Sequence, residues 1–234
     1  GLPVFCFADY QGTVVSLSSD GQVLAVGKPI EGRLSVYRFD GSDWRALGND
    51  LSRSNQRFGA SVALASDGLT LIVGAPLALG ANGGSGIAEV YRYRSQENVW
   101  SRSFLLGGVS SQQRNVGFAV AISTDGNTAA IADTRGVRIF DYNGASWTQR
   151  GETIFSRPVS RASLALASNG QTIVIGNRGG NPAPGQVAVY DYNGSDWMQR
   201  GADIVGQPGD AAARVAVSSD AQTLAIGAAG FGDN

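Results

Sequence analysis

Residues 18–27 read SSDGQVLAVG, and this ten-residue phrase decides the fold because it returns four more times. The later copies read ASDGLTLIVG at 65–74, STDGNTAAIA at 123–132, ASNGQTIVIG at 167–176 and SSDAQTLAIG at 218–227. Asp20 and Asp220 stand four repeats and 200 positions apart, so the mean period is 50 residues. Self-similarity at this period indicates a protein built from stacked, repeated units.

The residues around each phrase predict a hairpin. An alternating apolar segment precedes the turn, as at 61–64 and 119–122, and this period of two predicts a half-buried strand. Asp-Gly or Asn-Gly then predicts a tight turn in which both residues can take positive φ. The second strand of the hairpin is expected at segments such as 71–73 and 173–175.

Two further strands are expected in each repeat. A glycine-rich loop of variable length leads to a third strand, predicted at 34–39, 88–93, 137–142 and 187–192. A second polar turn then leads to a fourth strand, expected to begin at Trp44, Trp100, Trp147 or Trp197. No segment shows helical apolar spacing beyond one turn, so each unit is predicted to be a four-stranded antiparallel sheet.

Such a sheet cannot bury both of its faces alone, so successive units must stack, and radial stacking of four-stranded sheets makes a propeller. We therefore predict an all-β chain, a β-propeller of four-stranded antiparallel blades. About 4.5 repeats are visible, as part of a larger ring of six to eight blades. A linear β-solenoid is the alternative, although its coils repeat at shorter periods.

The chain is interpreted as a single partial propeller over residues 1–234. Residues 1–9 are expected to end an earlier blade. The repeats fall at about 10–56, 57–115, 116–155 and 156–210, with an incomplete repeat at 211–234.

Composition excludes several function classes. Eighteen basic and nineteen acidic residues give a net charge of −1, which lacks the basic field that nucleic acid requires. No run of apolar residues is long enough to span a membrane as a helix. The chain has no histidine and one cysteine, Cys6, so it cannot supply Ser-His-Asp or Cys-His catalysis or an ordinary zinc site.

The acidic residues recur at structural positions. Four aspartates lie in the predicted hairpin turns and two on the third strands: Asp20, Asp67, Asp125 and Asp220, then Asp141 and Asp191. Hairpin chemistry explains this repetition, so no catalytic, cofactor-binding or metal-binding residue is assigned. The glycine-rich segment Gly80–Gly86 joins two strands and precedes no helix, which favours an inter-strand loop over a phosphate-binding loop.

The aromatic residues and one asparagine allow two interpretations each. The recurring tryptophans, with Tyr37, Tyr91 and Tyr190, are expected to pack between blades, and a sugar-stacking platform is the alternative. Asn193-Gly194-Ser195 matches the N-glycosylation pattern of a secreted eukaryotic protein, so Asn193 is a candidate acceptor. The same Asn-Gly pair is also explained as a turn.

Two short motifs carry a resemblance to a known family. Arg57-Phe58-Gly59 precedes the first strand of the second repeat and Gly74-Ala75-Pro76 follows its second strand, with weaker echoes at Val116-Gly117 and Gly227-Ala228. This pattern resembles the FG-GAP repeats of integrin α-subunit propellers. The Trp-Asp endings and Gly-His pair of WD40 repeats are absent.

The resemblance implies a calcium site in the loop after the Gly-Ala-Pro segment. The corresponding loops here, at 28–33, 76–86, 133–136 and 177–186, lack the alternating carboxylates that Ca²⁺ requires. No cofactor is therefore expected, with Ca²⁺ restricted to blades outside this chain; Asp233-Asn234 could begin such a loop.

The resemblance also implies a function. We expect a non-enzymatic extracellular or cell-surface propeller that mediates protein or glycan interaction, adhesion or structural assembly. Its partners would be a protein, a glycan or further copies in a larger complex, with no nucleic acid and no membrane span. The alternative is a polysaccharide-active enzyme, a lyase or glycosidase, whose catalytic residues lie outside this chain.

Overall fold

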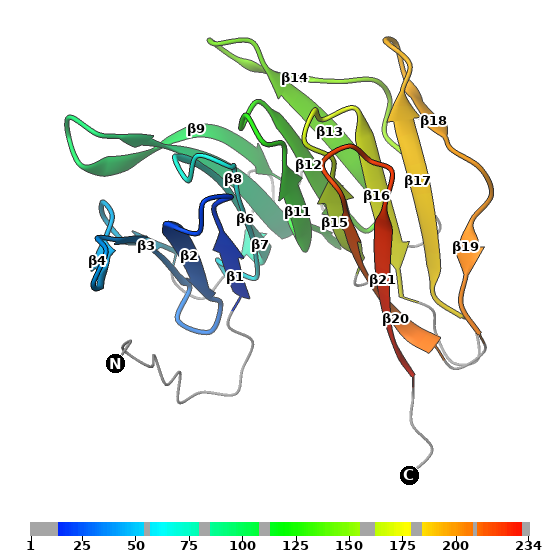
Figure 1. Ribbon diagram of the computed structural model, residues 1–234, viewed down its shortest axis with the longest axis horizontal. Coiled ribbons are helices and arrows are strands. Elements are labelled where there is room, and N and C mark those ends of the chain that lie inside the picture. The colour runs from blue at the N-terminus through cyan, green and yellow to red at the C-terminus, as the bar shows by residue number, and fades with distance from the viewer. Residues whose placement is uncertain are drawn as a thin grey trace. The chain divides into compact units, whose positions relative to one another are not determined.

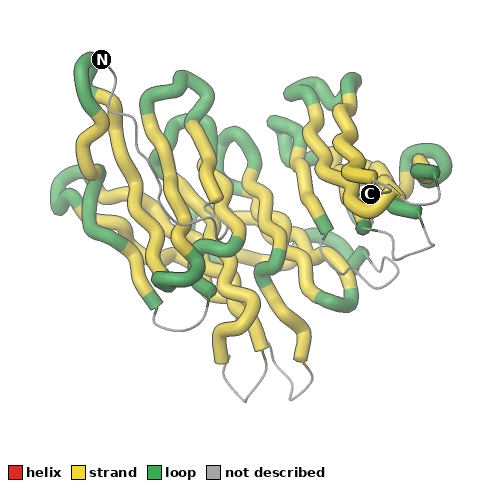
Figure 2. Tube along the Cα trace, turned by 90° about the horizontal axis from the view of Figure 1, so that it is seen from below, coloured by secondary structure: helices red, strands yellow, loops and turns green. Residues whose placement is uncertain are grey.

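The computed structural model describes residues 14–53, 57–79, 85–107, 113–154, 162–178, 184–207 and 210–230. These residues form strands and loops without a helix (Figure 2). In the same residues there is accordingly no helix with the length and apolarity to cross a membrane. Cys6, most of the Gly80–Gly86 loop and Asp233-Asn234 lie outside the described residues.

The chain forms two compact units, Gly1–Ile122 and Ser123–Asn234. In the first unit, blade 1 is an antiparallel sheet in the order β1-β2-β3-β4 (Figure 1). Strand β5 pairs with β3 in the same sheet. The strands of this blade are β1 (Val14–Leu17), β2 (Val23–Lys28), β3 (Arg33–Phe39), β4 (Trp44–Ala46) and β5 (Leu51–Ser52).

Blade 2 repeats this arrangement with longer strands. They are β6 (Ser61–Leu64), β7 (Thr70–Leu79), β8 (Ser85–Arg94) and β9 (Val99–Gly107). The short strand β10 (Gln113–Val116) lies parallel to the start of β8, a pairing that the sequence did not predict. The next strand, β11 (Ala119–Ile122), begins a sheet with the order β11-β12-β13-β14.

The second unit contains the rest of that sheet and a complete blade 4. Its strands are β12 (Thr128–Asp133), β13 (Gly136–Tyr142), β14 (Trp147–Gln149), β15 (Ser163–Leu166), β16 (Thr172–Asn177), β17 (Gln186–Tyr192), β18 (Trp197–Gln199) and β19 (Ile204–Val205). Strands β15 to β18 lie side by side in sequence order (Figure 1). A two-stranded sheet of β20 (Asp210–Val217) and β21 (Leu224–Gly230) follows.

The predicted all-β architecture of four-stranded antiparallel sheets is confirmed, and the structure corrects it in local details besides β10. The segment predicted as a loop from Pro76 begins as strand, because β7 continues to Leu79 through a register irregularity after Ala75. A bulge of this kind absorbs the kink that Pro76 introduces without ending the strand.

The hairpin turn differs in detail from the predicted one. Gly21 takes positive φ, at 70°, whereas Asp20 does not. The Asp20 carboxylate instead accepts hydrogen bonds from the Ser18 hydroxyl at 2.6 Å and from the Gln22 amide at 2.9 Å. The turn therefore requires aspartate because its side chain accepts hydrogen bonds. It requires glycine because this position has a positive φ angle.

Each blade has two apolar faces. Directly paired residues share a face of the sheet, so Leu17 and Leu24 lie on one face of blade 1 and Ser16 and Ala25 on the other. We call the face with Leu17 and Leu24 the front face and the face with Ser16 and Ala25 the back face. In the other blades, the same names apply to the faces that carry the repeat-equivalent residues. In the first unit the back face of blade 1 packs on the front face of blade 2, a core that contains Val23, Ala25, Leu34, Val36, Val62, Leu64, Leu71 and Val73.

In the second unit the same rule joins blade 4 to the next strand pair. The back face of blade 4, with Val174 and Val187, packs on Val215, Val217 and Leu224 of β20 and β21. Repeat-equivalent positions thus make equivalent interfaces in both units.

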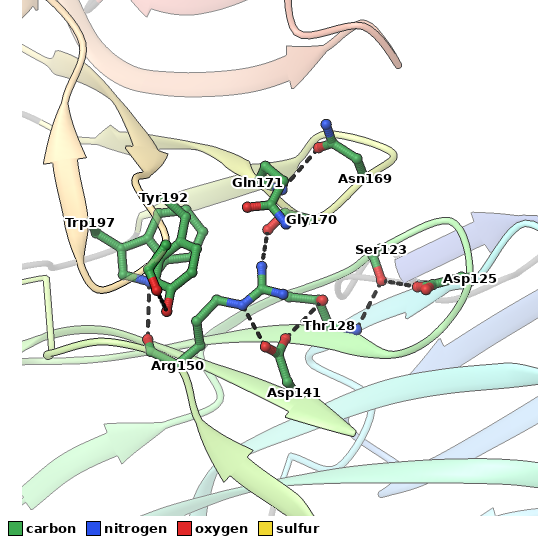
Figure 3. A network of polar contacts seen from close by, with 11 residues as sticks. Ser123, Asp125, Thr128, Asp141, Arg150, Asn169, Gly170, Gln171, Tyr192 and Trp197 are labelled. Atoms are coloured by element: carbon green, nitrogen blue, oxygen red, sulfur yellow. Dashed lines mark hydrogen bonds and ion pairs between the residues drawn. The ribbon is translucent and has the colours of Figure 1, made fainter. Parts of the chain in front are cut away.

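Polar contacts add to this stacking in the second unit (Figure 3). Arg150 pairs with Asp141 of its own blade at 2.5 Å, and its Nη1 donates at 2.7 Å to the carbonyl of Gly170 in the next blade's turn. Its guanidinium also lies over the Tyr192 ring, 4.9 Å from the centroid. The Asp141 carboxylate accepts a second bond from the Thr128 hydroxyl, so one aspartate orients the arginine that joins two blades.

Candidate anion-binding site

A buried carboxylate lies at the centre of the third strand of blade 2. The Glu89 side chain is completely buried on the front face of β8. Arg53, which follows β5 of blade 1, donates from Nη2 to Oε1 at 2.5 Å and from Nε to Oε2 at 3.1 Å. Arg102 of β9 donates from Nη1 to Oε1 at 2.7 Å, and the Tyr91 hydroxyl donates to Oε2 at 2.9 Å. We call these four residues the Glu89 cluster.

Secondary structure explains how residues so far apart in sequence meet. Tyr91 is two residues from Glu89 on the same strand, so both side chains lie on one face of the sheet. Arg102 is paired with Tyr91 across β8 and β9, which places it diagonally opposite Glu89. Arg53 is positioned from blade 1, where its amide donates to the Gly32 carbonyl at 2.8 Å.

Electrostatics keep the glutamate ionised. Burial by itself raises the pKa of Glu89, but the hydrogen bonds from Arg53, Arg102 and Tyr91 outweigh burial and leave that pKa below its ordinary value. Burial and the adjacent Glu89 charge raise the pKa of Tyr91. The carboxylate is therefore an acceptor for both guanidiniums, and the phenol is a neutral donor at physiological pH.

The cluster retains one positive charge, since two guanidiniums face one carboxylate. Their side chains are 32% exposed for Arg53 and 45% exposed for Arg102, whereas Glu89 is hidden. Arginine presents five N–H donors in a planar fork, and Glu89 engages only some of them. The exposed side of the cluster thus fits a carboxylate or a phosphate.

The cluster is missing from the residues predicted from the sequence. Position 89 corresponds in the repeat to Ser35, Arg138 and Ala188, so its residue type changes from blade to blade. The available signal was a single acidic residue in the middle of a largely apolar strand, because an acidic side chain is buried only with partners. The sequence does not reveal the arginine partners of Glu89 in the same way, since Arg53 belongs to another repeat.

The aspartates predicted to be structural do make structural contacts. Asp125 accepts bonds from Ser123 and from the Asn127 amide, and Asp220 repeats this pattern with Ser218 and Gln222. Asp191 on the third strand pairs with Arg200 at 2.6 Å, as Asp141 does with Arg150. None of these aspartates joins the Glu89 cluster.

Two of the recurring tryptophans, Trp100 and Trp197, contact the preceding blade, as predicted for them. The indole N–H of Trp100 donates to the Leu47 carbonyl of the preceding blade at 2.8 Å, and that of Trp197 donates to the Arg150 carbonyl at 3.0 Å. Their ring partners are Tyr93 and Tyr192, with centroids 5.4 Å apart in both pairs. Tyr91, expected in the same packing role, lies partly in that core and also binds Glu89.

The remaining predictions concern loops and one turn. In the 28–33 loop Lys28 pairs with Glu31, and in the 133–136 loop Asp133 accepts bonds from the Arg135 and Gly136 amides. Asn193 is exposed, and its Oδ1 accepts bonds from the Ser195 and Asp196 amides, a turn that Asn143 repeats outside any glycosylation motif. Glycosylation of Asn193 stays a prediction.

Comparison with known proteins identifies the architecture. No family model matches the chain, and no curated protein matches its sequence. Among solved structures, a putative 6-phosphogluconolactonase from Bacteroides uniformis superimposes with a TM-score of 0.65 at 15% identity, covering 92% of this chain and 63% of its own. The periplasmic gluconolactonase PpgL of Pseudomonas aeruginosa gives a TM-score of 0.64 at 16% identity, covering 94% and 65%.

A third similar structure is the β-propeller domain of Cps50 (Swd1) from Myceliophteria thermophila, with a TM-score of 0.60 at 13% identity, covering 93% of this chain and 62% of that one. The chain thus spans less than two thirds of each of these neighbours. At such identities the likeness shows the fold alone, and the fold is that of a partial β-propeller.

The comparisons correct one functional prediction. The expectation that the chain is not an enzyme is contradicted, because two of the similar propellers carry the names of lactonases. That expectation treated the absence of histidine and a repetitive surface as signs of a purely structural role. A propeller repeats its framework and can still bear a functional site at one blade.

Proposed function

We propose that this chain is part of a propeller enzyme that hydrolyses a lactone of an acidic or phosphorylated sugar. In this proposal Arg53 and Arg102 bind the anionic group of the substrate. The enzyme considered from the sequence was a polysaccharide lyase or glycosidase, so this proposal keeps an enzymatic function but names a different reaction and substrate class.

The observation that supports it is the Glu89 cluster. A completely buried carboxylate holds two partly exposed guanidiniums in fixed positions, and the group has a net charge of +1. Holding both arginines in place before the substrate arrives lowers the side-chain entropy lost on binding. Paired guanidiniums in fixed orientation suit the oxygens of a phosphate or carboxylate.

The cluster binds and does not transfer protons. Glu89 is committed to four hydrogen bonds with its pKa lowered, and the pKa of Tyr91 is raised, so neither group exchanges protons near neutral pH. Lactone hydrolysis adds the oxygen of water to the ring carbonyl, breaks the ring C–O bond and yields a carboxylate, a hydroxyl group and a proton. The base that activates this water belongs, in the proposal, to residues outside this chain.

We also propose that the protein works outside the cytoplasm. The support for this location is that one structural neighbour is named as a periplasmic enzyme.

Binding of the reaction product tests the proposal. Isothermal titration of the chain with 6-phosphogluconate should give saturable binding that weakens with added salt, because the contact is between charges. Arg102→Gln should weaken binding about tenfold or more, the loss typical of a charged hydrogen bond. Arg102 is the residue to replace because Arg53 still makes two hydrogen bonds to Glu89 in the Arg102 variant, so the buried carboxylate keeps a charged partner.

The matched control is Arg45→Gln. Arg45 is also an exposed arginine paired with a carboxylate, that of Asp40, but it lies on β4 away from the cluster. This variant should bind 6-phosphogluconate like the unmodified chain. Equal affinities for the Arg102 and Arg45 variants, or no saturable binding to the unmodified chain, would refute the proposed role of the cluster.

A further inference from the structure

The turn between β17 and β18 of blade 4 places three hydrogen-bond donors on one side-chain carbonyl. Asn193 Oδ1 accepts bonds from the Ser195 amide, the Ser195 hydroxyl and the Asp196 amide, each at 2.9 Å. Gly194 follows Asn193, and both residues are exposed. A Cβ at Gly194 would meet no atom within 4 Å outside its two chain neighbours. The side-chain amide of Asn193 is therefore open to water and uncrowded on the side of the next residue.

An Asn-Gly pair in such a turn can react with itself. The Gly194 nitrogen loses its proton to solvent and attacks Cγ of Asn193, because glycine has no side chain to hinder the approach. The new N–C bond closes a five-membered succinimide ring, and the side-chain nitrogen takes up a proton and leaves as ammonia. Water then opens the ring at either of its two carbonyls, which yields aspartate or isoaspartate.

The three donors on Oδ1 promote the first of these steps. Negative charge develops on Oδ1 as the Gly194 nitrogen adds to Cγ. Donors already aimed at the oxygen where charge develops stabilise such a transition state. The Ser195 and Asp196 donors thus act on Asn193 as an oxyanion hole built into the turn.

Blade 3 has the same turn with one donor fewer. Asn143 Oδ1 accepts bonds from the Ala145 amide at 3.0 Å and from the Ser146 amide at 2.9 Å. Ala145 stands where blade 4 has Ser195, so this turn lacks the hydroxyl donor. Asn143 is therefore a natural reference for the effect of that hydroxyl.

A third Asn-Gly pair, Asn169-Gly170, lies in the hairpin turn of the same blade 4 and is held differently. The Gly170 amide donates to the Ala167 carbonyl at 2.9 Å, and Gly170 is buried. Its carbonyl accepts the bond from Arg150. The nitrogen that would attack Asn169 is thus engaged in another bond, within a peptide that is fixed on both sides.

We propose that Asn193 is a site of spontaneous deamidation, which reacts faster than Asn143 and much faster than Asn169. The modification concerns the turn alone and does not depend on the function proposed for the Glu89 cluster. A glycan on Asn193 would exclude it, because the glycan is attached to the nitrogen that must leave.

The two products affect the blade differently. Aspartate fits the turn, because blade 1 has Asp40-Gly41-Ser42-Asp43 at the same place, and Asp40 Oδ1 accepts the same three bonds from Ser42 and Asp43. Isoaspartate instead adds a methylene to the main chain between β17 and β18. That change would displace Trp197, which directly follows the turn and donates to the Arg150 carbonyl of blade 3.

Peptide mapping by mass spectrometry measures the three rates in one sample. The full chain, produced without glycosylation, is incubated in mildly alkaline buffer, and each Asn-Gly peptide is followed for exchange of the amide –NH₂ for –OH. Asn193 should react about threefold faster than Asn143 and about tenfold faster than Asn169, where tenfold corresponds to about 1.4 kcal/mol of activation free energy.

Two reciprocal variants test the hydroxyl donor directly. Ser195→Ala should lower the rate at Asn193 to that of Asn143, and Ala145→Ser should raise the rate at Asn143 to that of Asn193. In each variant the unchanged turn is the internal control, and circular dichroism checks that the chain is folded. In urea the three sites should react at similar rates, because the turns are then lost.

Several results would overturn the proposal. If Asn193 stays intact in the folded chain while it reacts in urea, the turn protects the asparagine. Equal rates at Asn193 and Asn143 in the folded chain, or reciprocal variants that leave both rates unchanged, would show that the donors on Oδ1 have no effect. Rate differences that persist in urea would assign them to local sequence.

Discussion

Gly27 of β2 lies against the backbone carbonyl of Gly59, the residue that leads into the first strand of the next blade. A Cβ at Gly27 would overlap the Gly59 carbonyl oxygen, so the two blades approach more closely here than any side chain would allow. The φ angle of Gly27 is not in the left-handed region. Glycine is therefore required at this position for space and not for backbone conformation.

Replacing Gly27 by alanine should accordingly destabilise the chain. We expect Gly27→Ala to lower the free energy of unfolding by about 2 kcal/mol, the usual cost of overpacking. Gly227→Ala is the matched control, because Gly227 holds the same repeat position and its Cβ would meet only ordinary contacts, the nearest at 3.7 Å. Urea denaturation compares the two, and equal losses would contradict the steric explanation.

Ala221 should gain stability when changed to glycine. It occupies the turn position that glycine holds in the other four repeats, and its φ is 59°. A left-handed conformation costs a residue with a Cβ about 1–2 kcal/mol, part of which the flexibility of glycine in the unfolded chain cancels. We expect Ala221→Gly to raise the free energy of unfolding by about 0.5–1 kcal/mol.

The control for that change is Ala225→Gly, on the strand that follows. Glycine within a strand is unfavourable, so this variant should be less stable by about 0.5–1 kcal/mol. Thermal denaturation followed by circular dichroism would show opposite shifts for the two substitutions. A loss of stability in both would mean that Ala221 is not strained.

Arg150 should matter more to stability than Arg200, its repeat equivalent. Both pair with an aspartate on the third strand and donate to a carbonyl in the next turn, Gly170 for Arg150 and Ala221 for Arg200. Arg150 is largely buried and stacks on Tyr192, whereas Arg200 is more exposed. We expect Arg150→Met to cost about 2–3 kcal/mol and Arg200→Met less than about 1 kcal/mol in urea denaturation. Equal costs would show that burial does not decide the strength of this contact.

Glu89 should make stability depend on pH. Its folded-state pKa is lowered, so its contribution is complete above the unfolded-state pKa and is lost as pH falls through the folded-state value. Glu89→Gln should cost about 3 kcal/mol at pH 7, because two guanidiniums lose their carboxylate. The difference from the unmodified chain should shrink as the pH falls through about 4.3, where the carboxylate is half-protonated in the unfolded chain.

Denaturation at pH 7, pH 5 and pH 3 measures this difference. Glu97→Gln is the control, since Glu97 makes an exposed ion pair with Arg94 at 3.6 Å and should change stability by less than about 1 kcal/mol. A Glu89 effect that is the same at all three pH values would show that the carboxylate charge is not what stabilises the cluster.

Much of this fold could be predicted from local pattern. The alternation at 61–64 and 119–122 matches β6 and β11, and the recurring tryptophans begin or nearly begin the fourth strands. The parallel strand β10 was not predicted, because Gln113–Val116 has no alternation and pairs with a strand edge far from it in sequence. The FG-GAP resemblance remains a prediction. Phe58 of that motif is fully buried, and Gly59 contacts the preceding blade.

The sequence by itself determined the period, the strand order within a blade and the all-β class, because hairpins and alternating strands depend on residues close together in the chain. Only the tertiary structure decided which residues meet across blades. Glu89 and Arg53 are 36 positions apart and belong to different repeats, and no local periodicity relates them. Their contact follows from the stacking of one blade on the next, which brings a buried carboxylate and an arginine together where neither would be stable alone.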